Sequence, residues 1–327
     1  MSTRWGMTVP LGGVPLAEHA AVFAALTDAG FTDLWSSEVA GSDAFTPLTL
    51  AAVWQPRARL GTAIAPVFTR GPGLLAMTAA ALAEAAPGRF QLGIGASSPV
   101  VAGDWNAAEF TRPYARSRDM LRFLRTALAG EVVDEEYETF RVRRFRLERP
   151  PVVPPAILLA ALRPGMLRLA AAEADGVILN WLAATDVPRA LGEAKSERPD
   201  FDVVARIFVC PTEDAAYART AGRRMIAAYL TVPAYAEFHR WLGRESQLGP
   251  MWTAWAAGDR RGALAAIPDE VVDQLIVHGS PEECGAHVAR YAEAGVEVPV
   301  MALIPTPELE KGGPTALTQL LPRLGPQ

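Results

Sequence analysis

A short apolar run in the first third of the chain ends in small residues, namely Gly93, Gly95, Ala96, Ser97 and Ser98. Glycine carries no side chain, so a flat or phosphorylated ligand can approach the backbone closely at Gly93 and Gly95. The N–H groups beyond them are available as hydrogen-bond donors. We therefore expect a ligand here, and the alternative is a tight turn that needs glycine for its conformational freedom.

A second candidate site lies at Pro164, where a helix is predicted to begin because proline suits the first helical turn. Arg163 precedes the proline, and the segment from Ala161 to Gly165 supplies backbone N–H groups. Free N–H groups at a helix N-terminus, with a guanidinium beside them, attract anions. The sequence thus predicts an anion site, and the alternative is a proline-started helix whose arginine faces solvent.

Other kinds of site find little support in the sequence. The four histidines are scattered, and the two cysteines, Cys210 and Cys284, are far apart. No HxH, HExxH, GxSxG or Walker motif is present, and we predict no bound metal. The net charge of −5 argues against nucleic acid as a partner, because phosphate contacts need a basic face.

The composition is that of a globular protein, with 50% hydrophobic and 20% charged residues among 327. No signal peptide is visible in the sequence, and no apolar run reaches the roughly 18 residues of a membrane span. We expect a cytoplasmic protein without membrane contact.

Short apolar segments alternate with helical ones along the chain. The predicted strands are Trp5–Val9, Asp33–Ser36, Arg59–Ala65, Phe90–Gly95, Ala156–Ala160, Gly176–Leu179, Val203–Val209 and Val298–Leu303. The predicted helices are Leu16–Ala29, Pro47–Trp54, Gly73–Ala86, Ser117–Ala129, Pro164–Ala174, Val187–Ala194, Glu213–Leu230 and Ser280–Gly295.

This alternation fits an α/β fold of the (β/α)8 TIM-barrel type better than an open sheet. Two segments interrupt the rhythm. Residues 131–155 predict a hairpin before the fifth strand, and residues 231–269 form an aromatic-rich insertion after the seventh. The insertion fits a lid over the site or an extra helical hairpin. We predict a single domain over residues 1–327.

Four segments occur in an informative order, namely LGTAIAP at 60–66, TRGP at 69–72, GRFQLGIGAS at 88–97 and ILLAALRPGMLRLAAAEADGVILNWL at 157–182. Together with residues 268–300 they resemble the bacterial luciferase-like monooxygenase superfamily, and most closely its branch of coenzyme F420-dependent oxidoreductases. The resemblance spans almost the whole chain. It implies a TIM barrel that binds F420 or FMN at the carboxyl ends of the strands, commonly as a homodimer.

The resemblance also implies roles for particular residues. Ala63-Ile64, followed by Ala65, stands where many members carry a non-prolyl cis peptide against the deazaflavin ring, whereas an ordinary trans strand is the alternative. Residues 95–98 would contact the ring or its ribityl chain. The cofactor phosphate would bind at the turn into the next helix, at Ala161, Leu162, Arg163, Gly165 and Met166.

The loop after the second strand carries the candidate catalytic residues Glu38 and Asp43. In related dehydrogenases an acidic residue is followed here by a histidine that acts as the catalytic base. Glu38 matches the acid, but Val39 occupies the histidine position, and valine cannot move a proton. Glu38 or Asp43 could position the substrate or protonate a reduced product, and a helix cap or a polar surface loop is the alternative for each.

Two further candidates, Asn180 and Trp181, leave the sixth strand at the end of the barrel that carries function. They could hold the cofactor and wall the pocket, and core packing is the alternative for the indole. Arg89 precedes the fourth strand, at the opposite end of the barrel, where we expect a structural ion pair.

The resemblance therefore implies an enzyme that transfers a hydride between F420 and a small organic substrate. The missing histidine favours reduction of an electron-poor double bond or carbonyl-like group over oxidation of an alcohol. An FMNH2-dependent monooxygenase and a non-catalytic flavin- or deazaflavin-binding protein are the alternatives, and an unrelated sugar-phosphate-binding barrel is a more distant one. The substrate and the direction of transfer stay open.

Overall fold

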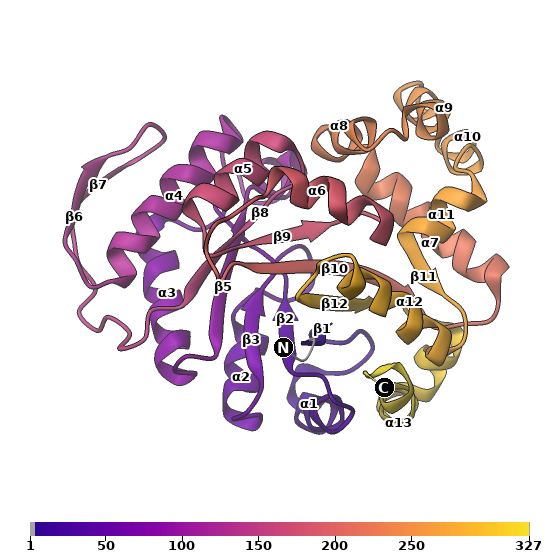
Figure 1. The fold of residues 1–327 in the computed structure, drawn as a ribbon, viewed down its shortest axis with the longest axis horizontal. Coiled ribbons are helices and arrows are strands. Elements are labelled where there is room, and N and C mark those ends of the chain that lie inside the picture. Colours follow the sequence, from indigo (N-terminus) through magenta and orange to yellow (C-terminus); the bar gives the residue numbers. More distant parts are fainter. Residues whose placement is uncertain (1–3, 327) are drawn as a thin grey trace.

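The computed structural model describes residues 4–326, and its centre is a closed barrel of eight parallel strands (Figure 1). Each strand pairs with the next in the ring, and the last pairs with the first. In ring order they are β1 (Gly6–Thr8), β2 (Asp33–Ser36), β3 (Arg59–Thr62), β5 (Phe90–Gly95), β8 (Ala156–Ala160), β9 (Gly176–Asn180), β10 (Asp202–Cys210) and β12 (Val298–Leu303). The predicted (β/α)8 barrel is confirmed.

Helices surround the barrel and follow its strands in the chain. They are α1 (His19–Asp28), α2 (Thr46–Trp54), α3 (Pro72–Ala85), α4 (Pro113–Leu128), α5 (Pro164–Glu173), α6 (Val187–Glu193), α7 (Ala215–Leu230) and α12 (Pro281–Glu293). Two short strands join the ring from outside it: β4 (Ala65–Pro66) pairs with β5, and β11 (Ile276–His278) pairs with β10. The helices begin and end within a few residues of their predicted bounds.

A last helix, α13 (Pro307–Leu324), packs against α1 and α12 and was not predicted. The side chain of Thr306 accepts a hydrogen bond from the N–H of Leu309 and so caps its start. Gly313 has a φ of 54°, which kinks the helix, and Pro314 follows it. These helix breakers conceal the helical pattern in the sequence.

Both interruptions of the barrel rhythm contain regular structure. Residues 131–155 include β6 (Val133–Glu136) and β7 (Arg141–Phe145), which form the predicted antiparallel hairpin. The second insertion folds into α8 (Pro233–Trp241), α9 (Glu245–Ala256) and α10 (Arg260–Ala265), and α11 (Asp269–Leu275) leads back to β11. In Figure 1 the hairpin lies at the left edge and α8–α10 lie at the upper right.

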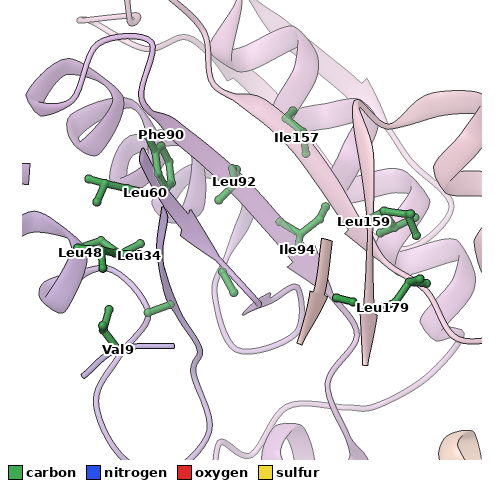
Figure 2. Close-up of a cluster of buried hydrophobic side chains, with 14 of the residues drawn as sticks. Val9, Leu34, Leu48, Leu60, Phe90, Leu92, Ile94, Ile157, Leu159 and Leu179 are labelled. Atoms are coloured by element: carbon green, nitrogen blue, oxygen red, sulfur yellow. The ribbon is translucent and has the colours of Figure 1, made fainter. Parts of the chain in front are cut away.

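The main hydrophobic core lies between the strands and the surrounding helices. Figure 2 shows part of it, with Leu92 and Ile94 of β5 beside Ile157 and Leu159 of β8. The residues between them on the same strands face the barrel interior, because successive side chains of a strand point to opposite faces. Parallel strands that are buried on both faces are apolar at almost every position, which explains their clear signal in the sequence.

The barrel interior is filled around the indole of Trp35, which is 1% exposed and packs with Leu158, Ile178, Val204, Val298 and Val300. Glycine makes room for this ring, because a Cβ at Gly61 would overlap it and a Cβ at Gly6 would approach it to 3.1 Å. Gly93 serves the same kind of packing. A Cβ there would overlap the carbonyl of Thr62 and the side chain of Ile178, so the expected ligand approach at Gly93 is wrong.

A charged network closes the barrel at the amino ends of its strands. The guanidinium of Arg4 lies 2.5 Å from Asp33 and 3.1 Å from Asp202, and it donates to Gln91 at 3.1 Å. Asp33 and Gln91 are almost fully buried, at 1% and 4% exposed. Burial lowers the pKa of Arg4, but the hydrogen bonds and charges of Asp33 and Asp202 raise that pKa overall, so this end is closed by a permanent cation between two carboxylates.

Arg89 also lies at this end, as expected from its place before β5, but it makes no ion pair with a described residue. Its guanidinium donates to the carbonyl oxygens of Ala58 at 2.7 Å, Gln55 at 3.2 Å and Ala52 at 3.3 Å. Arg89 therefore ties the end of α2 to the turn that leads into β3. The expected ion pair is wrong, although the structural role is supported.

Candidate functional site

Glu38, in the loop after β2, is held by the TRGP segment. Its carboxylate lies 2.7 Å from the guanidinium of Arg70 and accepts hydrogen bonds from the hydroxyl of Thr69 at 3.3 Å and the N–H of Ala44 at 3.1 Å. Both partners of the ion pair are largely buried, with side chains 18% and 17% exposed. This geometry fixes the loop and leaves the carboxylate with several partners within the protein.

Asp43 lies at the start of α2 and accepts hydrogen bonds from the N–H groups of Phe45 at 2.8 Å and Thr46 at 3.0 Å. Burial raises the pKa of Asp43, but these hydrogen bonds and the charge of Arg70 lower it overall. An ionised carboxylate at a helix N-terminus is a stabilising cap. The hydrogen bonds of Asp43 are those of the helix cap that we gave as its alternative role. Val39, in the same loop, is 43% exposed.

The peptide bond between Ala63 and Ile64 is cis, as the resemblance implies. The loop after β2 holds this segment from one side, because Ala63 donates its N–H to the carbonyl of Ser36 at 2.6 Å. The N–H of Glu38 in turn donates to the carbonyl of Ile64 at 3.3 Å. Ala63 and Ile64 are half-buried, whereas Ala65 is buried within β4.

Gly95 ends β5 beside the cis segment. A Cβ at Gly95 would lie 2.9 Å from the Cβ of Ala160 and 3.2 Å from Cγ1 of Ile64, so glycine lets three backbone segments meet. Ala96, Ser97 and Ser98 follow and are half-buried.

The two serines of this turn differ in their hydrogen bonds. Ser98 accepts from the N–H of Val101 at 3.2 Å and so starts the π-helix η2 (Val100–Asp104). Ser97 has a φ of 63°, in the left-handed region that few residues other than glycine adopt. Its hydroxyl has no hydrogen bond to a described residue and is available to a ligand.

The turn from β8 into α5 presents free donors. The N–H of Ala161 bonds to the carbonyl of Ile178 at 3.1 Å and is not free. The N–H groups of Leu162, Arg163, Gly165 and Met166 have no acceptor among the described residues, as expected for the first turn of a helix. The exposed side chain of Arg163 likewise has no carboxylate within 4.0 Å in the described part of the chain. This donor set is suited to an anion.

Asn180 and Trp181 link the end of β9 to the second insertion. The side-chain amide of Asn180 donates to the hydroxyl of Tyr235 in α8 at 3.2 Å and accepts from the N–H of Trp181 at 3.0 Å. Trp181 has a φ of 55° and is 1% exposed. Its ring packs on Phe208 and Tyr229 with centroids 4.3 and 5.0 Å away. The indole is thus packed inside an aromatic cluster, and α8 reaches over the carboxyl end of β9.

Arg206 was not predicted as a site residue. It follows Val204 of the barrel interior by two positions on β10, so its side chain starts on the interior face. The guanidinium lies over the ring of Phe208, 4.9 Å from the centroid, and makes no hydrogen bond or ion pair with a described residue. A charged residue at an inward position of an apolar strand was the signal in the sequence.

His239 of α8 is another buried polar residue outside the predicted set. It is 0% exposed, and neither ring nitrogen has a hydrogen-bond partner among the described residues. Burial and the nearby charge of Arg244 lower the pKa of His239 to about 3. Arg244 itself is paired with Asp186 at 2.8 Å. The imidazole is therefore neutral at ordinary pH, and a group with so low a pKa is too weak a base to take up a proton there.

Residues 4–326 contain no cluster of three or more histidine, cysteine or carboxylate side chains that could hold a metal ion. Within the same residues no helix combines the length and the apolar character needed to cross a bilayer.

Comparison with known proteins identifies relatives over almost the full chain. The family model described as luciferase-like monooxygenase matches residues 2–297. A protein of Mycobacterium tuberculosis is 29% identical over 326 residues. Its name describes it, as a provisional assignment, as a coenzyme F420-dependent oxidoreductase. The match covers 89% of this chain and 92% of that protein.

Two solved structures show the same fold. Coenzyme F420-dependent tetrahydromethanopterin reductase from Methanopyrus kandleri superposes with a TM-score of 0.77 and 20% identity, and 98% of each chain is covered. The oxygenating constituent of 3,6-diketocamphane monooxygenase from Pseudomonas putida, a type II Baeyer-Villiger monooxygenase in complex with FMN, has a TM-score of 0.65 and 16% identity. That match covers 100% of this chain and 98% of the other.

Proposed function

Because the chain belongs to the luciferase-like monooxygenase family, we propose that it is an oxidoreductase that binds coenzyme F420 and exchanges a hydride between this cofactor and a small organic substrate. The M. tuberculosis relative, 29% identical, supports F420 as the cofactor. The observation that carries the proposal is the set of free donors at the start of α5, on the same end of the barrel as the cis segment.

The residues of this end suit a flat ring with an anionic tail. The N–H groups of Leu162, Arg163, Gly165 and Met166 lack acceptors among the described residues, and a phosphate would supply them. The charge of Arg163 would add to this binding. The cis segment at Ala63–Ile64 and the free hydroxyl of Ser97 would face the ring, and we assign Gly95, Ala96 and Ser98 to the same wall.

Bound F420 supplies the hydride chemistry, and the protein supplies orientation and a dry environment. The contacts of Glu38 with Arg70 and Ala44 hold the loop that bonds to the cis segment. We therefore assign Glu38 a positioning role and keep its carboxylate as the candidate proton donor or substrate contact. Asp43 holds the same loop at the start of α2. Reduction of an electron-poor double bond or carbonyl-like group fits this site, because no imidazole stands beside Glu38.

Titration of the purified protein with F420 and with FMN, followed by cofactor absorbance and fluorescence, tests the proposal. We expect F420 to bind at least about tenfold more tightly than FMN, a difference of about 1.4 kcal/mol. Tighter binding of FMN, with oxygen consumed when the flavin is reduced, would support a monooxygenase instead. The FMN-containing structural neighbour is the observation that favours this second candidate.

A non-catalytic carrier of flavin or deazaflavin is the third candidate. It predicts tight cofactor binding without consumption of reducing equivalents by any member of a broad panel of enones, imines and ketones. Turnover of one such compound with reduced F420 excludes it. Binding of neither cofactor contradicts all three functions.

We also propose a homodimer and a cytoplasmic location. Exposed apolar side chains of α2 and α3, including Val53, Leu74 and Met77 at 73%, 52% and 51% exposed, support an interface between copies. Light scattering of the purified protein tests the oligomeric state, and a monomer at all concentrations would contradict the dimer. Cell fractionation tests the location.

A further inference from the structure

Arg206 carries a charge that no carboxylate in the described part of the chain balances, although its guanidinium lies over the ring of Phe208. Its Nε is buried without a hydrogen-bond partner, and the guanidinium has no carboxylate within 4.0 Å among residues 4–326. Arg206 is half-buried, and other half-buried or buried arginines have partners: Arg4 has two carboxylates, Arg244 has Asp186, and Arg89 has three carbonyl oxygens. A guanidinium that is partly withdrawn from water and has no anionic partner is suited to a ligand that supplies the missing charge.

The position of Arg206 fits a ligand that enters the barrel from its carboxyl end. On β10 it is paired in register with Asn180, the last residue of β9. Interior side chains below this level, such as Trp35 and Val204, are apolar and tightly packed. Arg206 thus lies where the packed apolar interior ends and the carboxyl ends of the strands begin.

Tyr235 provides a second donor close to Arg206. Its hydroxyl accepts from Asn180 and donates its own proton to no described residue. Burial raises the pKa of Tyr235 to about 12, and the neighbouring charge of Arg206 opposes this rise in the pKa. The phenol is therefore protonated and can donate. Asn180, the register partner of Arg206, bonds to Tyr235 and so connects the two groups. A guanidinium and a phenol placed in this way are suited to a negatively charged oxygen.

We propose that Arg206 and Tyr235 form a subsite for a carboxylate group of the substrate, which makes the substrate a small organic acid. The proposal that the bound acid is a substrate rests on the proposed function, whereas the anion subsite itself does not depend on it. Tyr229, which is half-buried, is the member of the adjoining aromatic cluster that would contact the apolar part of such an acid, whereas Trp181 and Phe208 are packed inside the cluster.

The first test is the thermal stability of the protein without ligands. Arg206→Met removes an unbalanced charge and keeps a side chain of similar length, so we expect the melting temperature to rise by about 2 °C or more. Arg89→Met is the matched control, because it removes three hydrogen bonds and should lower the melting temperature. A melting temperature of Arg206→Met that falls as in the control would assign Arg206 a structural role and overturn the proposal.

The second test uses formate, acetate and benzoate against chloride at equal ionic strength, with benzamide as the uncharged analogue. We expect at least one carboxylate to raise the melting temperature of the wild type and to bind about tenfold more tightly than its amide, which corresponds to about 1.4 kcal/mol. Arg206→Met should lose this preference, Arg206→Lys should keep part of it, and Tyr235→Phe should weaken it. A wild type that responds to none of the three carboxylates would overturn the proposal.

Titration with F420 separates this inference from the proposed function. Unchanged F420 affinity in Arg206→Met, with lost carboxylate binding, is the expected result. If Arg206→Met loses F420 affinity while carboxylates have no effect on the wild type, Arg206 serves the cofactor and the inference fails. If F420 does not bind the wild type while carboxylates do, the proposed function fails and the subsite stands.

Discussion

The carboxylate of Glu38 and the guanidinium of Arg70 lie 2.7 Å apart, although 32 positions separate them in the chain. The pair joins the loop after β2 to the segment after β4. Both segments flank the cis peptide between Ala63 and Ile64, and the carbonyl of Ile64 accepts from the N–H of Glu38. Glu38, the candidate catalytic acid of the sequence analysis, therefore also holds the loops of the site together.

We expect Glu38→Ala and Arg70→Ala each to lower the free energy of unfolding by about 1–3 kcal/mol, because each leaves a largely buried partner unpaired. The double variant should cost clearly less than the sum of the two. Denaturant unfolding of the four proteins measures this coupling. Additive effects would show that the pair contributes no stability of its own.

Arg163→Ala should weaken F420 binding about tenfold, or about 1.4 kcal/mol, because it removes the side-chain cation beside the free N–H groups of α5. Arg168→Ala is the matched control on the same helix, since Arg168 is exposed and pairs with Glu193 at 2.7 Å. Fluorescence titration with F420 measures both. Equal affinities of the two variants would remove Arg163 from the site.

Gly61→Ala should destabilise the protein by about 1–3 kcal/mol, because its new methyl group meets the buried ring of Trp35. Trp35→Leu alone should also destabilise it by leaving a cavity. In combination the smaller side chain accepts the methyl group, so the double variant should be more stable than the sum predicts. Thermal unfolding of the three variants tests this, and simple additivity would contradict the packing argument.

The imidazole of His239 should make stability depend on pH in acid. Burial lowers the pKa of His239 to about 3 in the folded protein, whereas an unfolded histidine has a pKa of about 6.5. Between these values the unfolded chain binds a proton that the folded protein does not. Stability therefore falls as the pH drops below about 6.5, by about 2 kcal/mol at pH 5.

His239→Leu removes the titrating imidazole and places an apolar side chain in the same buried position. We expect the variant to lose less stability than the wild type when the pH is lowered from 7.5 to 5. Denaturant unfolding at the two pH values gives the comparison, in which the other three histidines are common to both proteins. Identical losses would show that His239 is not buried in its neutral form.

The barrel was predictable because its strands are buried on both faces, so that segments such as Phe90–Gly95 are apolar throughout. Glycine and proline also marked the ends of most helices. The second insertion was less predictable, because its aromatic residues fit a lid or a helical hairpin equally. The structure shows three short helices there, from α8 to α10. The helix α13 was missed because Gly313 and Pro314 interrupt it.

The candidate site was predictable only in its backbone. Turns such as Leu162–Gly165 follow from the end of a strand and the start of a helix, which are local patterns. The ion pair of Glu38 with Arg70 and the contact of Asn180 with Tyr235 join distant segments, and no local pattern reports them. Arg206 was overlooked because the sequence shows one charged residue within an apolar strand but does not show whether a carboxylate lies beside it in the fold.

The ion pairs of Arg4 with Asp33 and Asp202, together with the interior packed around Trp35, leave the carboxyl ends of the strands as the approach for a ligand in the described part of the chain. Whatever binds at those ends must arrive and depart by the same route. Two molecules that are stacked there cannot exchange independently, because the outer one blocks the inner one. Turnover of this protein should accordingly follow a compulsory sequence, in which the molecule that lies deeper enters first and leaves last.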